Sequence, residues 1–358
     1  MTTQIPRIEL QPGYSISRVI KGGWQLAGGH GSVDERQAVQ DMRVFVEAGI
    51  TTFDCADIYT GVEELIGKFI KQYKRELASG ELPPIQIHTK YVPDLDQLSN
   101  VTKAYTQAVI DRSLKRLGVE RLDLVQFGWW DYSIPRYVEA AQHLFELQTA
   151  GKIRYIAGTN FDASHLKEIL DAGVPIVADQ LQYSVLDHRP EGEHHQRMAK
   201  ENNLRFLCYG TVAGGFLSQR YLGVKEPKEP LENRSLVKYK LIIDEFGGFE
   251  LFQEVLHALK QIADKYDVGI AEVAAQYVLQ KPLVAGVIIG ARNSDHLESI
   301  KKLGSLRLAE EDLQKLHAIV SKAKGPAGPV YSLERDRTGK HGKIMRYNLN
   351  TIVQKCDE

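Results

Sequence analysis

LDLVQF at residues 122–127 and AGVIIG at residues 285–290 are short, nearly continuous apolar runs. Strands of a parallel sheet read this way, because helices cover both faces of such a sheet and leave no polar side. Each run is followed by a stretch with helical spacing of its apolar residues. The two segments therefore predict parallel strands joined by helical crossovers.

The same alternation extends along most of the chain and predicts eight strands, each followed by a helical segment. Eight such units close naturally into a (β/α)8 TIM barrel. The rival is an open doubly wound sheet, which for a dinucleotide would want a GxGxxG turn after the first strand. The first strand ends in GGWQLAGGHG, residues 22–31, which lacks that spacing. The predicted strands are Ser17–Gln25, Thr51–Ala56, Ile85–Tyr91, Leu122–Trp130, Ile153–Thr159, Ile176–Gln182, Leu204–Thr211 and Leu283–Gly290.

Two segments fall outside the repeat. Residues 212–248, after the seventh strand, predict a long polar loop, which in a compact domain is usually functional or mobile. The Gly-, Pro- and basic-rich tail predicts an extension packed on the barrel or partly disordered. Between these two segments, residues 249–280 predict one long helical stretch that belongs to the repeat. We therefore expect one barrel domain over residues 1–330 and a C-terminal extension over residues 331–358.

Charge and composition exclude several classes of protein. Lys and Arg number 45 against 46 Asp and Glu, which argues against a strongly basic nucleic-acid binder. The sequence contains no run of about 18 apolar residues, so no membrane span is expected, and the N-terminus does not resemble a secretory signal. Cys55, Cys208 and Cys356 are scattered and odd in number, which favours a cytoplasmic protein without disulfides, and no spacing predicts a metal site.

Asp54, Tyr59 and Lys90 stand at or just after the ends of neighbouring predicted strands, where barrel enzymes carry their catalytic groups. A tyrosine has a pKa of about 10, so a nearby cation that favours the phenolate helps it to donate a proton. Lys90 can supply that charge, and Asp54 can pair with Lys90. The alternative is a purely structural ion pair inside the barrel with a surface tyrosine.

Five stretches together resemble the aldo-keto reductase family. They are FDCADIY (53–59), IHTKY (87–91), GKIRYIAGTNF (151–161), DQLQY (179–183) and CYGTVAGGFL (208–217). The resemblance implies a (β/α)8 barrel, a nicotinamide cofactor, usually NADPH, and a small-molecule aldehyde or ketone as substrate. It also implies that Tyr59 protonates the carbonyl oxygen, that Lys90 lowers the pKa of Tyr59, and that Asp54 pairs with Lys90.

Gly128 departs from the family pattern, which has a histidine there that donates to the carbonyl. Three readings stay open. The chain is a working reductase with weakened carbonyl polarisation and a roomier pocket, a poor reductase that binds the cofactor for another purpose, or a chain with a laboratory substitution.

The resemblance also implies how a cofactor is held. Thr159, Asn160 and Gln180 match residues that hold the carboxamide, and Tyr209 matches the tyrosine that stacks on the nicotinamide. The glycine-rich stretch that follows could cradle the pyrophosphate with its backbone N–H groups. The full set of expected cofactor residues is Gly22, Gly23, Trp24, Asp54, Thr159, Asn160, Gln180, Tyr209, Gly210, Thr211, Val212, Gly214, Leu217, Gly290, Arg292 and His296.

Arg292 is the expected partner of an adenosine 2′-phosphate, because a guanidinium suits phosphate oxygens. Gly290 and Ala291 replace the lysine and serine of many members, and His296 stands where an arginine or glutamine is common. The sequence therefore favours NADPH as the cofactor. Its phosphate site has fewer expected contacts than is usual in the family, so NADH stays open.

Trp24, Gly128, Trp129 and Trp130 are expected to line the substrate pocket, which suggests an apolar or aromatic substrate. The second function left open is a cofactor-binding regulatory or interaction subunit with little reductase activity. Nothing in the sequence decides the oligomeric state.

Overall fold

A computed structural model describes residues 4–28 and 31–350 of the chain. Eight parallel strands form a closed barrel in chain order, with β10 pairing back to β3, which confirms the predicted (β/α)8 fold. The barrel strands are β3 (Val19–Gly22), β4 (Thr52–Asp54), β5 (Gln86–Tyr91), β6 (Leu122–Phe127), β7 (Ile153–Thr159), β8 (Ile176–Gln182), β9 (Arg205–Tyr209) and β10 (Val284–Gly290).

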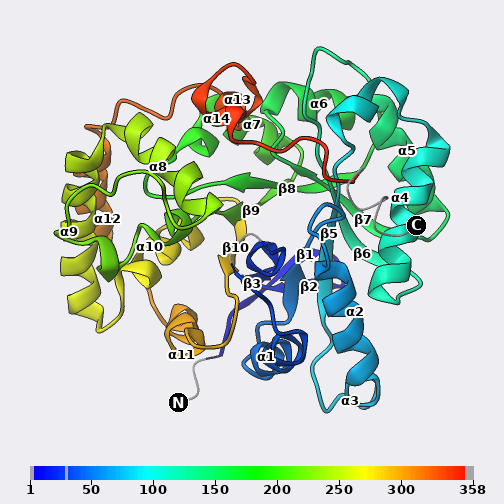
Figure 1. Ribbon diagram of the computed structural model, residues 1–358, viewed down its shortest axis with the longest axis horizontal. Coiled ribbons are helices and arrows are strands. Elements are labelled where there is room, and N and C mark those ends of the chain that lie inside the picture. The colour runs from blue at the N-terminus through cyan, green and yellow to red at the C-terminus, as the bar shows by residue number, and fades with distance from the viewer. Residues whose placement is uncertain (1–3, 29–30, 351–358) are drawn as a thin grey trace.

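Helices surround the strands (Figure 1). They are α1 (Glu35–Glu47), α2 (Val62–Gln72), α3 (Lys74–Ser79), α4 (Lys103–Leu117), α5 (Tyr137–Thr149), α6 (Ala163–Asp171), α7 (Glu193–Glu201), α8 (Arg234–Phe246), α9 (Phe249–Tyr266), α10 (Ile270–Leu279), α11 (Leu297–Lys301), α12 (Glu310–Val320), α13 (Ser332–Arg335) and α14 (Lys340–Lys343). Among residues 4–28 and 31–350, no helix combines the length and apolar character needed to cross a membrane.

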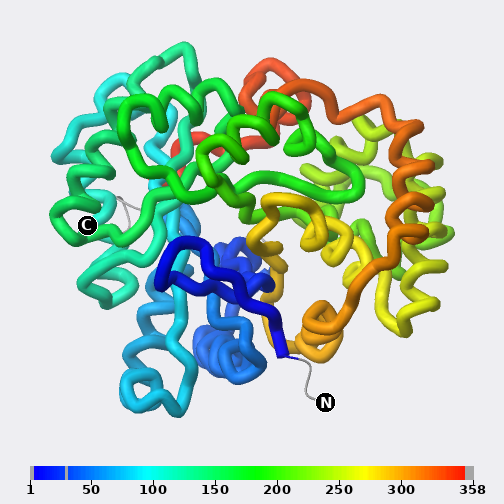
Figure 2. The backbone as a smooth tube through the Cα atoms, turned by 180° about the vertical axis from the view of Figure 1, so that it is seen from behind, coloured from blue at the N-terminus to red at the C-terminus, as the bar shows by residue number. Residues whose placement is uncertain are grey.

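An N-terminal hairpin of β1 (Arg7–Gln11) and β2 (Tyr14–Ser17) precedes the barrel and was not predicted. Its apolar residues Leu10, Tyr14 and Ile16 form one buried cluster with interior residues of the strands, such as Leu124 and Leu207. The hairpin lies in front of the barrel in Figure 2. It therefore closes one end of the barrel interior and leaves the other end for a site.

The prediction of a loop over residues 212–248 is wrong for its second half, which forms α8. Asn233 caps this helix by accepting a hydrogen bond from the backbone N–H of Leu236, and apolar residues recur at helical spacing from Leu236 to Phe246. The prediction of one helical stretch over 249–280 is also wrong. The chain breaks between α9 and α10 at Asp267, which has a positive φ of 52°.

The described part of the C-terminal tail packs on the barrel. In Figure 1 it runs from α12 past α13 and α14 toward α4. The backbone N–H of Leu95 donates to the carbonyl of Tyr347, and Asp94 accepts from the backbone N–H groups of Leu349 and Asn350. The end of the predicted extension, with Cys356, lies outside the described residues.

Candidate active site

A polar layer crosses the barrel interior one step above the apolar cluster that the hairpin closes. Side chains alternate along a strand, so Gln126 follows Leu124 on the inner face, and Gln180 follows Ala178. Lys90 pairs in register with Gln126. Inner-face positions near the carboxyl ends of the strands therefore carry charge and amide groups where the layer below is apolar.

Asp54 is the centre of this layer. Its carboxylate accepts from Lys90 Nζ at 2.7 and 2.9 Å, and Lys90 also donates to the Cys55 carbonyl at 2.9 Å. Oδ1 of Asp54 further accepts from the amide nitrogens of Gln126, at 2.9 Å, and Gln180, at 2.6 Å. Because these donors are buried and converge on one carboxylate, they hold the ammonium of Lys90 in one place.

Tyr59 lies beside Lys90, whose Nζ is 5.1 Å from the centre of the tyrosine ring. Burial raises the pKa of Tyr59, and the charge of Lys90 lowers it without cancelling that rise, so the net pKa stays above the ordinary value. Burial lowers the pKa of Lys90, but Asp54 and Tyr59 raise it further, so Lys90 stays charged. Tyr59 is therefore protonated near neutral pH, next to a cation that stabilises its phenolate.

A cavity of about 950 Å³ opens above this layer. The expected residues that line it are Gly22, Trp24, Asp54, Tyr59, Lys90, Gly128, Trp129, Trp130, Thr159, Asn160, Gln180, Tyr209, Gly210, Thr211, Val212, Gly214, Leu217, Gly290 and His296. Gly23 lies beside the cavity, where its backbone N–H donates to the Asp54 carbonyl and a Cβ would stand 2.8 Å from that oxygen. The structure thus gathers residues from eight strands around one space.

Gly128 does not leave an open hole. A Cβ placed there would lie 3.0 Å from Cγ2 of Thr159 and 3.3 Å from Cγ2 of Val92. Both distances are shorter than ordinary carbon–carbon contacts. Two methyl groups therefore close on the position of the family's histidine, which argues against a pocket enlarged at this point.

The residues expected to hold a carboxamide lie together at the ends of β7, β8 and β9. Asn160 has a positive φ of 61°, and its Oδ1 accepts from the Tyr209 hydroxyl at 2.7 Å, which leaves its amide nitrogen as a donor. The amide nitrogen of Gln180 already donates to Asp54 and Gln126, so its carbonyl oxygen is the atom left to accept. This combination of one donor and one acceptor fits a primary amide.

The stretch from Gly210 to Leu217 fits the backbone of a phosphate-bearing ligand. Gly210, Gly214 and Gly215 have positive φ values, and a Cβ on Gly215 would meet nothing within 4 Å. The hydroxyl of Thr211 is buried and has no hydrogen-bond partner among the described residues. Tyr239 of α8 covers Gly210 and Gly214, so the turn is open at Gly215, and there the unsatisfied hydroxyl of Thr211 suits a ligand that brings its own oxygens.

The end of β10 differs from the expectation for a phosphate pocket. A Cβ on Gly290 would stand 2.2 Å from Nε2 of Gln25, so the amide of Gln25 occupies the space of the family's lysine. Arg292 is exposed and lies with its Nη1 2.9 Å from the position of a Cβ on Gly31. His296 lines the cavity. Arg292 itself is not among the described residues that line the cavity, and its guanidinium lies beside Gly31 in the turn after β3.

The three tryptophans play different parts around the cavity. The ring of Trp24 lies 5.1 Å from that of Tyr59. Trp129 is only 2% exposed, and its indole N–H donates to the carbonyls of Asp131 and Ile134, so it has no hydrogen bond to offer a substrate. The ring of Trp130 meets that of Tyr347 edge-on at 5.1 Å.

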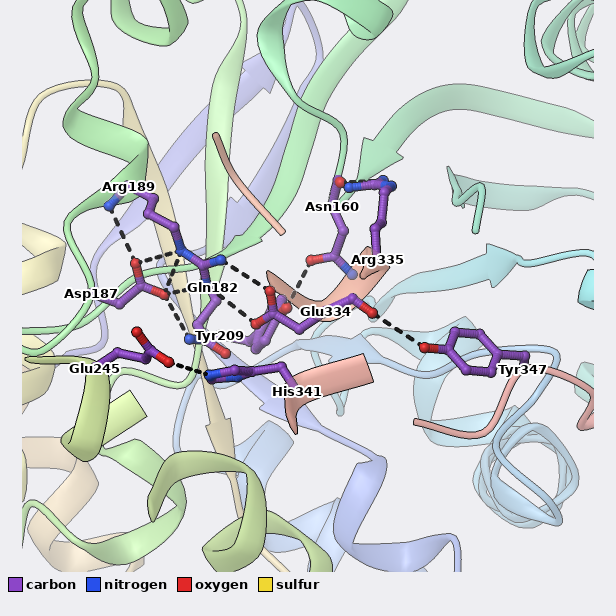
Figure 3. A network of polar contacts seen from close by, with 10 residues as sticks. All are labelled: Asn160, Gln182, Asp187, Arg189, Tyr209, Glu245, Glu334, Arg335, His341 and Tyr347. Carbon is purple, nitrogen blue, oxygen red and sulfur yellow. Dashed lines mark hydrogen bonds and ion pairs between the residues drawn. The ribbon is translucent and has the colours of Figure 1, made fainter. Parts of the chain in front are cut away.

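A buried ionic network fastens the C-terminal tail beside the cavity (Figure 3). Arg189 donates to both oxygens of Glu334, at 2.9 and 3.2 Å, and pairs with Asp187 at 2.7 Å. Burial raises the pKa of Glu334, but Arg189 lowers it further, to about 2. Arg335 donates to the backbone carbonyl of Asn160 at 2.7 Å. The tail is thus held against the residues expected to bind a carboxamide.

Sequence reasoning missed several residues of the cavity wall. One of them, Gln25, lies just after β3, and the others come from α8 and the tail, far from the strand ends in the sequence: Arg234, Lys238, Tyr331 and Arg346. The basic composition of the tail was the signal for Arg346, but only the fold shows that it returns to the cavity.

Comparisons with known proteins agree with this geometry. The sequence model described as "Aldo/keto reductase family" matches residues 18–321. Aldo-keto reductase YhdN of Bacillus subtilis (strain 168) is 28% identical over 330 residues, which cover 89% of this chain and 95% of that protein. The chloroplastic pyridoxal reductase of Arabidopsis thaliana is 28% identical over 326 residues, 85% of this chain and 83% of that protein.

Among solved structures, the glycerol dehydrogenase AKR11B4 from Gluconobacter oxydans has a similar fold. Its TM-score is 0.71 at 23% sequence identity, and the match covers 92% of this chain and 99% of that one.

Proposed function

The chain belongs to the aldo-keto reductase family and is an NAD(P)H-dependent oxidoreductase, and we propose that it reduces a small-molecule aldehyde or ketone to an alcohol with NADPH. The observation that carries the proposal is the set of Tyr59, Lys90 and Asp54 on the wall of a cavity that also holds a carboxamide-binding arrangement. A cytoplasmic location stays a prediction, supported by the two buried free thiols of Cys55 and Cys208.

The chain's own residues supply the proton. The reduced nicotinamide, when bound, supplies the hydride that forms the new C–H bond. Tyr59 gives its hydroxyl proton to the carbonyl oxygen, which becomes the alcohol. Lys90 stabilises the phenolate left on Tyr59, Asp54 keeps Lys90 in position, and the phenolate recovers a proton from solvent. Burial raises the pKa of Tyr59, which favours the protonated form that reduction requires.

Loss of NADPH absorbance with a panel of aldehydes and ketones tests this function. We expect turnover on at least one member and tight NADPH binding, measured by the quenching of protein fluorescence. Tight binding with no turnover on the whole panel would contradict the proposal and favour the second candidate, a cofactor-binding regulatory subunit. The observation in favour of that candidate is Gly128, which has no side chain to donate to a carbonyl.

Replacing Arg292 with alanine should weaken NADPH by about 10- to 100-fold and NADH by less than about twofold, because a hydrogen bond to a charged group contributes about 1.5–3 kcal/mol. Only NADPH carries the 2′-phosphate. Fluorescence titration with both cofactors measures the effect, and Arg197→Ala, an exposed arginine on α7, is the control. Equal losses for both cofactors would overturn the assignment of Arg292.

A further inference from the structure

Four cationic side chains besides Lys90 line the cavity, and they are Arg220, Arg234, Lys238 and Arg346. Lys238 lies 4.9 Å from the centre of the Tyr209 ring, and the carboxylate of Glu334 acts on it with an opposite charge. Arg220, also in the wall, pairs with Glu232. The charges of Arg234 and Arg346 are therefore the ones that need an explanation.

Arg234 begins α8 and donates at 3.4 Å to the carbonyl of Ile344, two residues before Arg346 in the tail, and both arginines line the cavity. Burial lowers the pKa of Arg234, and the like charge of Arg346 lowers it further. Within residues 4–28 and 31–350, neither arginine forms an ion pair with a carboxylate. Arg346 is exposed and Arg234 is half-buried, so an anion that enters the cavity between them can contact both guanidinium groups.

Arg234 lies beside both expected ligand sites, because its neighbour Ser235 packs against Gly214 of the glycine-rich turn while its own guanidinium lies over Trp24. The guanidinium of Arg234 lies 5.8 Å from the centre of the Trp24 ring, which in turn lies 5.1 Å from the ring of Tyr59. Arg346 precedes Tyr347, whose ring packs on Trp130 at the end of β6. The rim expected to hold the adenosine 2′-phosphate is instead at the end of β10, next to α11.

Hydrogen bonds and ion pairs hold the tail segment that carries Arg346 against the barrel. The bonds of Glu334 to Arg189 and of Arg335 to Asn160 fix one part of it, and the Tyr347 hydroxyl donates to the carbonyls of Glu334 and Gly342 (Figure 3). A charge on a fastened segment loses less entropy on binding than a charge on a free end.

We propose that Arg234 and Arg346 form an anion subsite, and that the natural substrate is a carbonyl compound with a carboxylate or phosphate about one aromatic ring away from the reacting carbon. The site rests on the proposed carbonyl reduction, with Tyr59 at one end of the substrate and the two arginines at the other. This subsite would add a positively charged end to the apolar substrate pocket that the tryptophans predict. The other anion that could reach the arginines is the pyrophosphate of the cofactor, and the experiment separates the two.

The test compares 3- and 4-carboxybenzaldehyde with their methyl esters, which keep the aldehyde and remove the charge. We expect the unmodified protein to favour at least one acid over its ester by about tenfold in kcat/KM. Arg346→Ala should remove that preference, with less than a twofold change for the esters and for the Kd of NADPH. Arg346→Lys should retain part of the preference, and Lys343→Ala, an exposed charge of the same tail, should retain all of it.

A second measurement keeps the subsite testable if neither aldehyde turns over. Calorimetry on the complex with NADP⁺, which cannot reduce the aldehyde, should show tighter binding of the acid than of its ester, and Arg346→Ala should remove the difference. This binding preference would support the anion subsite even without turnover, and the reductase would be contradicted only if the wider panel of aldehydes and ketones also showed none. No preference for either acid in both measurements would overturn the subsite. A weaker Kd for NADPH in Arg346→Ala, with equal losses for acids and esters, would assign the arginines to the cofactor and also overturn it.

Discussion

Replacing Tyr59 with phenylalanine should lower kcat by about 10²- to 10⁴-fold, the range that a positioned general acid contributes. The ring and its contact with Trp24 stay, and only the hydroxyl that donates the proton is lost. The Kd of NADPH should change by less than about twofold. Steady-state oxidation of NADPH and fluorescence titration measure the two quantities on the same preparation.

Tyr105→Phe is the matched control. It also removes a tyrosine hydroxyl, but Tyr105 lies on α4 and is not one of the described residues that line the cavity. We expect turnover unchanged in this variant. A Tyr59→Phe protein that keeps more than a third of the normal kcat would show that the proton comes from elsewhere. The pH dependence of kcat gives a further test. Reduction needs protonated Tyr59, so kcat should fall as the pH rises through the pKa of Tyr59. Burial raises that pKa above the ordinary value.

The barrel and the placement of Asp54 and Lys90 at neighbouring strand ends were predictable from sequence for the same physical reason. Strands buried on both faces are apolar, so a polar residue near a strand end, such as Asp54 or Lys90, stands out against its neighbours. The parallel barrel then brings these ends together without further information. Gln126 illustrates the limit, because sequence places it on the inner face but only the structure shows that it donates to Asp54.

The cavity wall beyond the strand ends was not predictable in this way. The helix α8 lies between Pro230 and the pair Gly247 and Gly248, and these residues dominated the sequence pattern of a loop. Arg346 reaches the cavity through a long return of the chain that no local pattern encodes. The apolar residues of α8 recur at helical spacing, but that spacing indicates only a helix and does not show that the helix covers the cavity.

The Gly128 position shows why a missing side chain is hard to interpret from sequence. A glycine in place of histidine suggests free space, but the methyl groups of Thr159 and Val92 fill it. Gly128→His alone should therefore lower the free energy of unfolding by about 1–3 kcal/mol, as overpacking does. It should raise turnover little, because the imidazole cannot take its position without moving Thr159.

The double variant Gly128→His with Thr159→Ser should raise kcat for a neutral aldehyde by about 10²-fold, the lower end of the effect of one donor to a developing oxyanion. Serine removes Cγ2, the nearest atom to the new Cβ at 3.0 Å, and keeps a hydroxyl on a residue that lines the cavity. Val92 at 3.3 Å needs to move only a few tenths of an ångström. Thermal unfolding should show that most of the stability lost by Gly128→His returns.

Thr159→Ser alone is the control for this gain, and its kcat should stay within about threefold of the unmodified protein, since its hydroxyl is retained. A single Gly128→His variant as active as the double would show that the Thr159 methyl is no obstacle. A double variant that regains stability without gaining turnover would show that the missing donor does not limit this enzyme. In that case the proton and charge of Tyr59 and Lys90 suffice for the substrate that the cavity selects.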